Sequence, residues 1–245
     1  MKHDSFFRPL IKTFKNMVHV LGVDVVKYNF YHSGDKLLER VIRHFNVSTI
    51  LDVGANIGQY AEEVIRHGYK GEIYSFEPIS EVFQRLRKKS AKHAHWKAYQ
   101  LGIGGKEEEV IMNISENLFS SSFLKVGHAS LAADASTRIV REEKIRITTV
   151  DSFFKEKAFK PEVLLKLDIQ GYELEALKGA IRSLPSIKLI QAELSFTEVY
   201  EGGPLFDEVI GFLKGHGYEV FAIVPGFRDD SSGRMLQADG IFVKH

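Results

Sequence analysis

Short apolar runs alternate with amphipathic stretches along most of this chain. Each run has the length of a buried strand, and each amphipathic stretch repeats its apolar positions at the spacing of a helix. The pattern predicts strands at 50–52, 72–76, 98–103, 163–168, 187–194, 218–224 and 240–243. It predicts helices at 35–45, 59–68, 172–184 and 205–216. Between these elements, strands at 110–114 and 145–149 enclose a serine-rich, loop-like insertion that we expect near the ligand site.

Strands that alternate with helices indicate an α/β fold with a doubly wound, mostly parallel sheet. The last two strands have no helix between them, so we expect a terminal antiparallel strand. The length and the apolar fraction of 44% suit one sizeable core. We therefore divide the chain into an N-terminal helical extension or lid, residues 1–46, and a main domain, residues 47–245.

The N-terminal 30 residues carry five basic and two acidic side chains. Apolar residues recur between them at helical spacing, at Phe6, Phe7, Leu10, Ile11, Phe14, Val18 and Leu21. One interpretation is a basic amphipathic helix that makes weak contact with a membrane surface or a lipid-linked substrate. The other is a lid helix that packs on the main domain.

The composition narrows the chemistry. The chain has no cysteine, which excludes disulfides, thiolate nucleophiles and iron–sulfur clusters. The formal net charge of +1 gives no electrostatic reason to expect a nucleic-acid partner. No apolar run approaches the ~20 residues of a membrane span, and we expect a cytoplasmic protein without a transmembrane segment.

The segment 50–60 changes from an apolar run into a turn with glycines at Gly54 and Gly58, then continues as a helix. Glycines suit a turn against which a ligand lies, because a Cβ would collide with the ligand. The spacing differs from the Gly-x-Gly-x-x-Gly of dinucleotide sites, and the carboxylate of Asp52 would repel a pyrophosphate. That carboxylate suits a cationic ligand such as S-adenosylmethionine (SAM). The alternative is an ordinary strand-to-helix turn with a solvated Asp52.

Three more acids fall at or near predicted strand ends, where parallel α/β sheets bind ligands. Glu77 lies about 25 residues after Asp52, where an acid accepts hydrogen bonds from both ribose hydroxyls. Asp168 is placed to hold the sulfonium side of SAM, to orient an acceptor hydroxyl or to take its proton. Lys166 is expected to point to the same side of its strand as Asp168. Glu193 lies on the next predicted strand, 187–194. The alternatives are a surface position for Glu77 and a helix cap for Asp168.

The ten histidines do not predict a metal centre. His93 and His95 form a His-x-His pair without nearby carboxylates, and no His-Glu-x-x-His occurs. His128, in the serine-rich insertion, is the histidine best placed for acid–base chemistry.

Several segments together resemble the FkbM-type SAM-dependent methyltransferases: 52–58, 76–78, 166–180 and 239–243. Gln170 is a departure, because many members carry Glu there. The resemblance implies a class I, Rossmann-like methyltransferase fold and O-methylation of sugars or secondary metabolites. By analogy it also implies modification of surface glycans.

We therefore predict a SAM-dependent O-methyltransferase that acts on a hydroxyl of a small-molecule or carbohydrate acceptor. The predicted catalytic residues are Asp168, Lys166 and Glu193. The predicted cofactor contacts are Asp52, Gly54, Asn56, Gly58, Gln59, Glu77, Pro78, Ile103 and Asp168. The alternatives are a nucleotide-dependent oxidoreductase of Rossmann type, a nucleic-acid methyltransferase and a non-catalytic SAM-binding module.

Overall fold

A computed structural model of the chain describes residues 8–20, 34–157, 159 and 162–244. Its backbone divides into two compact units, Met1–Val41 and Ile42–His245. The first unit contains α1 (Arg8–His19) and most of α2 (Gly34–His44). Three apolar positions of the predicted N-terminal helix, Phe6, Phe7 and Leu21, lie outside the described residues. The proposed division at residues 46 and 47 stays a prediction.

The main sheet belongs to the second unit. Within the described residues it has seven strands, in the order β3 (Trp96–Tyr99), β2 (Glu72–Phe76), β1 (Thr49–Val53), β7 (Val163–Leu167), β8 (Ile187–Ser195), β10 (Gln237–Lys244) and β9 (Tyr218–Pro225). The pairs between β3 and β8 are parallel, whereas β10 is antiparallel to both β8 and β9. This confirms the predicted fold class and its terminal antiparallel strand: β10, the last described strand of the chain, is antiparallel and lies between β8 and β9.

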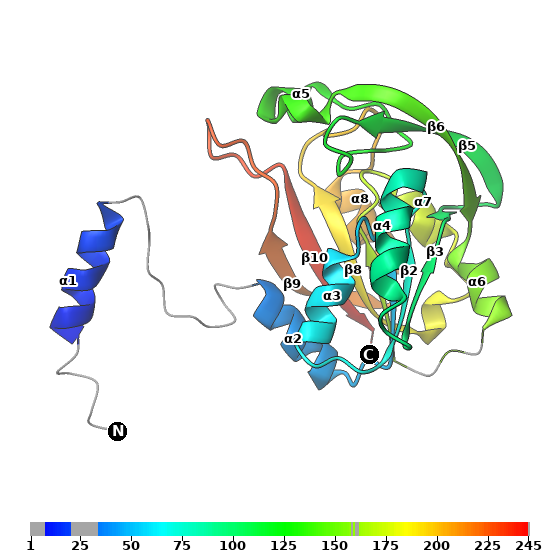
Figure 1. Ribbon diagram of the computed structural model, residues 1–245, viewed down its shortest axis with the longest axis horizontal. Coiled ribbons are helices and arrows are strands. Elements are labelled where there is room, and N and C mark those ends of the chain that lie inside the picture. Colours follow the sequence, from blue (N-terminus) through cyan, green and yellow to red (C-terminus); the bar gives the residue numbers. More distant parts are fainter. Residues whose placement is uncertain (1–7, 21–33, 158, 160–161, 245) are drawn as a thin grey trace. The chain divides into compact units, whose positions relative to one another are not determined.

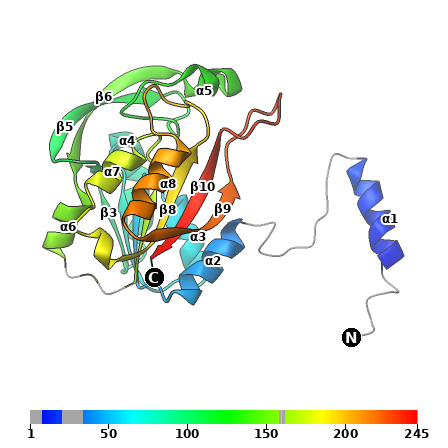
Figure 2. The ribbon, with the colours of Figure 1, turned by 180° about the vertical axis from the view of Figure 1, so that it is seen from behind.

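Helices cover both faces of this sheet. In Figure 1, α3 (Gln59–Arg66) and α4 (Ser80–Ser90) lie in front of it, and the view from behind in Figure 2 shows α7 (Glu173–Lys178) and α8 (Phe206–Gly215). Alternate strand residues face opposite sides. Leu51 and Leu165 are therefore buried in the same core as Leu177 and Leu213, the residues from the two helices behind.

The sheet order places a switch in winding between β1 and β7. From β1 the chain continues through α3 to β2, whereas from β7 it continues through α7 to β8, on the opposite side. Ligands in open α/β sheets bind in the crevice beside such a switch, at the carboxyl ends of the strands. The fold thus predicts a site at the ends of β1 and β7.

The serine-rich insertion forms a smaller sheet. Its strands are β4 (Gly102–Ile103), β6 (Ile139–Thr148) and β5 (Glu108–Ser115), and it carries α5 (His128–Ala133) and the 3₁₀ turn η1 (Ala135–Thr137). In Figure 1 the long β5 and β6 strands arch over the main sheet. The insertion is therefore more ordered than a loop, and both strands are longer than their apolar cores predict.

Two helical predictions differ from the structure. The sequence pattern does not predict α6 (Val150–Glu156), which Thr149 caps by accepting a hydrogen bond from the Ser152 backbone N–H at 3.0 Å. The helix predicted over 172–184 ends earlier, at Lys178, and a 3₁₀ turn follows at η2 (Leu184–Ser186). Gly179 is the C-cap; its carbonyl accepts the Asp151 backbone N–H at 2.9 Å, and a Cβ there would lie 2.0 Å from the Gly104 carbonyl oxygen.

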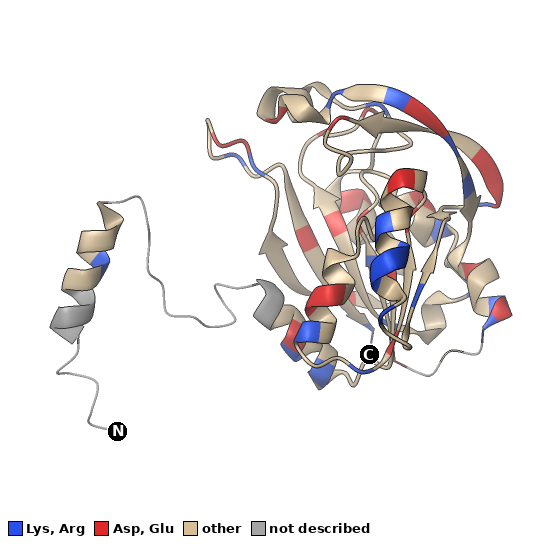
Figure 3. Cartoon of the chain, in the orientation of Figure 1, with Lys and Arg blue, Asp and Glu red and all other residues tan. Residues whose placement is uncertain are grey.

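The charges of α4 lie on a solvated face. Arg85, Arg87 and Lys88 are exposed, while Val82 and Leu86 are buried against the sheet, and Figure 3 shows the basic residues along the helix. Among the helices of the described part of the chain, none combines the length and apolar character needed to span a bilayer.

Candidate active site

The turn after β1 is tight and closely packed. Gly54 has a φ of +73°, and a Cβ at this position would lie 1.8 Å from the backbone oxygen of Asp168. The N–H groups of Gly54 and Ala55 both donate to the carbonyl of Phe76, at 3.1 and 3.0 Å. The turn is thus fixed between the ends of β2 and β7, and only glycine fits at its start.

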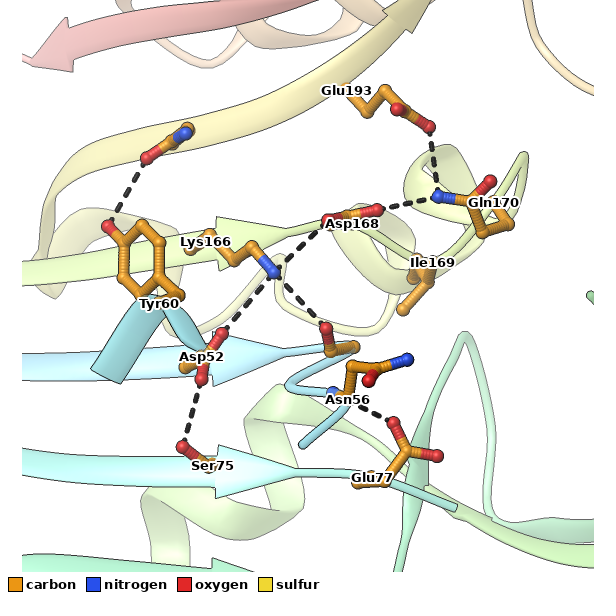
Figure 4. A network of polar contacts seen from close by, with 12 residues as sticks. Asp52, Asn56, Tyr60, Ser75, Glu77, Lys166, Asp168, Ile169, Gln170 and Glu193 are labelled. Atoms are coloured by element: carbon orange, nitrogen blue, oxygen red, sulfur yellow. Dashed lines mark hydrogen bonds and ion pairs between the residues drawn. The ribbon is translucent and has the colours of Figure 1, made fainter. Parts of the chain in front are cut away.

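Glu77, at the end of β2, reaches back to this turn (Figure 4). Its Oε2 accepts the Asn56 backbone N–H at 2.9 Å, and its Oε1 accepts the Ile79 backbone N–H at 2.8 Å. Burial raises the pKa of Glu77 to about 7, although these two N–H donors and the charge of Lys166 oppose the rise. Each carboxylate oxygen keeps a further lone pair for a ligand.

A row of polar side chains crosses the interior of the sheet below the turn. Ser75, Asp52, Lys166 and Gln191 are register partners on β2, β1, β7 and β8. Asp52 is 0% exposed; its Oδ2 accepts the Ser75 hydroxyl at 2.9 Å, and its Oδ1 lies 3.3 Å from Lys166 Nζ. A carboxylate buried this deeply needs such partners to remain charged.

Asp168 follows β7 and is the acid that reaches the surface of the site. Its side chain is 41% exposed, and its Oδ2 lies 3.4 Å from Lys166 Nζ. Its Oδ1 accepts a hydrogen bond of 2.7 Å from the amide Nε2 of Gln170. Both oxygens are therefore held in place, as Figure 4 shows, while part of the carboxylate stays accessible.

Gln170 connects Asp168 to a second acid. The same Nε2 lies 3.3 Å from Oε2 of Glu193, and the Tyr200 hydroxyl donates to the Gln170 Oε1. The Tyr200 contact orients the amide so that its NH₂ faces the carboxylates. Gln170 also has a φ of +56°, an uncommon conformation for a side chain of this size.

Glu193 lies behind Asp168 on β8. Burial raises its pKa well above the usual value, and the carboxylates of Asp168, Glu173 and Asp239 add to the rise. Its Oε2 also accepts a 2.7 Å hydrogen bond from the amide of Gln237. Glu193 is therefore a buried acid, held by the amides of Gln170 and Gln237, directly behind the more exposed Asp168.

A pocket of about 670 Å³, its open mouth included, lies above the turn. Most of the predicted site residues line it, namely Gly54, Asn56, Gln59, Glu77, Pro78, Ile103 and Asp168. The structure thus brings together residues from the ends of β1, β2, β4 and β7, as the fold's switch point predicts.

Four predicted site residues lie outside the pocket lining. Asp52 and Lys166 are beneath the turn, and Glu193 is behind Gln170. Gly58 packs against the core instead: a Cβ there would lie 2.7 Å from the ring of Trp96. Asp52 and Gly58 therefore do not line the pocket, and their contact with the cofactor stays a prediction.

The individual residues of the pocket wall were not predicted from the sequence. Its apolar part comes mainly from the insertion and from the start of α4, with Ile79, Met112, Leu118, Phe119 and Phe123. Ser121 and Gln170 add polar groups. The position of the serine-rich insertion near the site was the one available signal, because an isolated Met or Phe carries no chemical signature in the sequence.

The pocket fits an adenosyl ligand with a positive charge. A buried acceptor carboxylate on the turn suits ribose hydroxyls, and the apolar wall suits a flat purine. Within the described residues its lining contains Glu77 and Asp168 but no lysine or arginine. That charge balance suits the sulfonium and ammonium of SAM and would repel the pyrophosphate of a dinucleotide.

The fold and this pocket define a class I, Rossmann-like, SAM-dependent methyltransferase. The profile of the Methyltransferase FkbM domain family matches residues 52–220. The chain belongs to this family, which confirms the resemblance, and SAM is its cofactor.

Individual relatives are distant. A hexuronic acid methyltransferase of Haloferax volcanii is 25% identical over 146 residues, which cover 58% of this chain and 54% of the relative. A 2-O-methyltransferase of Sinorhizobium fredii is 21% identical over 182 residues, covering 72% and 74%. The chain spans about half the length of the Haloferax protein.

Among solved structures, a protein of Klebsiella pneumoniae assigned as an O-methyltransferase matches with a TM-score of 0.50 at 12% identity. The match covers 97% of this chain and 90% of that one. A protein of Staphylococcus aureus assigned as a caffeoyl-CoA O-methyltransferase matches with the same score and identity, covering 96% and 92%. At these identities the likeness supports the fold alone.

Proposed function

We propose that this methyltransferase transfers the methyl group of SAM to a hydroxyl oxygen of a carbohydrate or another small molecule. The carboxylate of Asp168 carries the proposal. It lines the pocket, it is 41% exposed, and Lys166 and Gln170 fix its two oxygens. A fixed, accessible carboxylate beside the cofactor pocket is suited to orient a hydroxyl and to receive its proton.

SAM would supply an electrophilic methyl group, so the protein has mainly to align the acceptor and to exclude water. Glu77 would accept hydrogen bonds from the ribose hydroxyls, and the turn at Gly54 would support the rest of the cofactor. Asp168 would take the proton that the acceptor hydroxyl loses. Lys166 and Gln170 keep the Asp168 carboxylate oriented, and Glu193 lies behind them beside the Gln170 amide.

The choice of oxygen as the methylated atom rests on two relatives. One is described as acting on a hexuronic acid and the other as a 2-O-methyltransferase. The amide and carboxylate groups of Gln170 and Asp168 at the pocket also suit a polyhydroxylated acceptor, because each bonds hydroxyl groups readily.

A screen of acceptors tests the proposal. The purified protein is incubated with SAM and a panel of hexosides, hexuronides, phenols, amines and a short RNA, and the release of S-adenosylhomocysteine is measured. We expect release with a sugar, and a new methyl ether in the product by NMR. Methylation on nitrogen, or of the RNA alone, would contradict the proposal. Binding of SAM without release for any member of the panel would favour a non-catalytic module.

A further inference from the structure

The ammonium of Lys166 lies where the cofactor turn meets the candidate base. Its Nζ donates to the carbonyl oxygen of Gly54 at 3.2 Å, and it lies 3.3 Å from Asp52 Oδ1 and 3.4 Å from Asp168 Oδ2. On its remaining side it lies 5.5 Å from the ring centroid of Tyr60, on α3. One ammonium thus contacts the turn, two carboxylates and an aromatic ring, with a side chain only 8% exposed.

This ammonium keeps its proton. Burial lowers the pKa of Lys166, but the nearby carboxylates of Asp168 and Asp52 outweigh burial and hold the pKa above its usual value. A group that stays charged at every pH near neutral neither accepts nor supplies a proton in the reaction. The predicted catalytic role of Lys166 is therefore better explained by what its charge holds in place.

The Gly54 carbonyl accepts its hydrogen bond from a charged donor, Lys166 Nζ. The peptide of Gly54 is set at positive φ between β2 and β7, and its N–H is already used by Phe76. A charged donor binds a carbonyl more strongly than a neutral one. Asp52, anchored by Ser75, in turn holds the ammonium below the turn, and Trp96 Nε1 donates to that same serine hydroxyl at 2.9 Å.

We propose that Lys166 is a positioning residue: its ammonium ties the Gly54 turn, on which SAM binds, to the carboxylate of Asp168. This inference rests on the proposed function. It makes the row of Ser75, Asp52 and Lys166 a support for the cofactor site rather than a part of its surface. The titratable groups that face the ammonium are Asp52, Tyr60, Glu77, Asp168, Glu193 and Asp239.

The test compares three variants by calorimetric titration with SAM over a range of pH. Lys166→Met keeps most of the length of the unbranched side chain and removes its charge. The double variant Lys166→Met/Asp52→Asn also removes the carboxylate that would be left buried and unpaired, so it remains informative if the single variant does not fold. Lys89→Met is the matched control, because it removes a lysine whose Nζ lies 2.7 Å from Glu62, away from the pocket lining.

Each variant has its own expected result. Lys166→Met weakens SAM binding about tenfold or more at alkaline pH, because the turn loses its charged donor. SAM binding weakens as Glu77 becomes protonated. The pH midpoint of this loss rises in Lys166→Met, because Lys166 lowers the pKa of Glu77, whereas Asp52 raises that pKa. In the double variant both effects on Glu77 are removed, so the midpoint returns toward the wild-type value while the affinity stays low. Lys89→Met binds as the wild type does.

A merely structural role would lower thermal stability without weakening SAM binding to the folded protein at alkaline pH. The inference is overturned if Lys166→Met binds SAM with wild-type affinity and midpoint, or if the double variant recovers full affinity. Failure of the wild-type protein to bind SAM at any pH would instead overturn the proposed function. A wild type that binds SAM but methylates no acceptor leaves this inference intact, because its readout is binding.

Discussion

Glu77 is the residue of the site whose charge changes near neutral pH. Its pKa is about 7 because it is buried, and ribose hydroxyls donate best to its ionised form. Binding of SAM should therefore lower this pKa. By linkage, SAM affinity rises with pH up to about 7 and then becomes constant; below this pH it falls by up to about tenfold per unit. Calorimetric titration at a series of pH values measures the effect.

Glu77→Gln is the control for that prediction. An amide of the same shape cannot ionise, so the variant should bind SAM more weakly and with little dependence on pH. A wild-type affinity that is constant through pH 7, or that rises toward acid, would contradict the assignment of Glu77 to the ribose.

Asp168 should matter for turnover more than for binding. Asp168→Asn keeps the shape of the side chain and removes the proton acceptor, and we expect kcat to fall by about 10²–10⁴-fold while the Kd for SAM changes little. Initial rates and calorimetry measure the two effects. Asp207→Asn, in the exposed first turn of α8, is a control that should retain activity. Unchanged turnover of Asp168→Asn would remove this residue from the chemistry.

At the residue scale, the sequence predicted which residues lie near the site, but not which of their side chains are buried and which line the pocket. An acid at the end of an apolar run marks the edge of the sheet, which is why Glu77 and Asp168 could be predicted. Asp52 also follows an apolar run in the sequence, as Glu77 and Asp168 do, but its carboxylate is buried beside Lys166. Burial depends on the register of β1 against β7, and a single strand contains no information on its partner.

Among the elements, the turn from β1 to α3 gives the sharpest test of packing. Gly54→Ala combines strain at φ +73° with a Cβ only 1.8 Å from the Asp168 backbone oxygen. Gly233→Ala is the matched control, because its φ is +74° and nothing lies within 4 Å of the added Cβ. We expect the control to lower the free energy of unfolding by about 1 kcal/mol.

The Gly54→Ala variant should lose more. Because backbone must move, we expect a loss of about 3 kcal/mol or more in the free energy of unfolding, measured by denaturant titration. It should also bind SAM poorly in its folded fraction. Equal losses for the two variants would mean that the turn is loose rather than fixed by β7.

The predictable elements were those whose pattern is local. The apolar runs of β1 and β7 and the amphipathic period of α3 are local signals, and all three elements were predicted. The short helix α6 and the early end of α7 depend on contacts between distant segments, such as Gly179 against Gly104. The order of β8, β10 and β9 likewise depends on long-range pairing, so the sequence predicted an antiparallel strand but not its place between the other two.

For the whole molecule, the cofactor site should not need the N-terminal extension. The residues of the described chain that line the pocket run from Val53 to Gln170. Removal of residues 1–33 should therefore leave the Kd for SAM within about twofold of the full chain, as expected for a separate unit. Calorimetry of the truncated protein is the measurement. A tenfold loss would place the extension in the cofactor site, whereas a loss of turnover alone would support a lid over the acceptor.

The central claim is that one pocket, built by the Gly54 turn, Glu77 and Asp168, holds SAM for methyl transfer. The most direct test is parallel calorimetric titration of the wild type and of Glu77→Ala with SAM, S-adenosylhomocysteine and NAD. We predict that both adenosyl ligands bind the wild type at micromolar concentration, that Glu77→Ala abolishes this binding, and that NAD does not bind. Binding of NAD, or SAM binding that is unaffected by Glu77→Ala, would contradict the account.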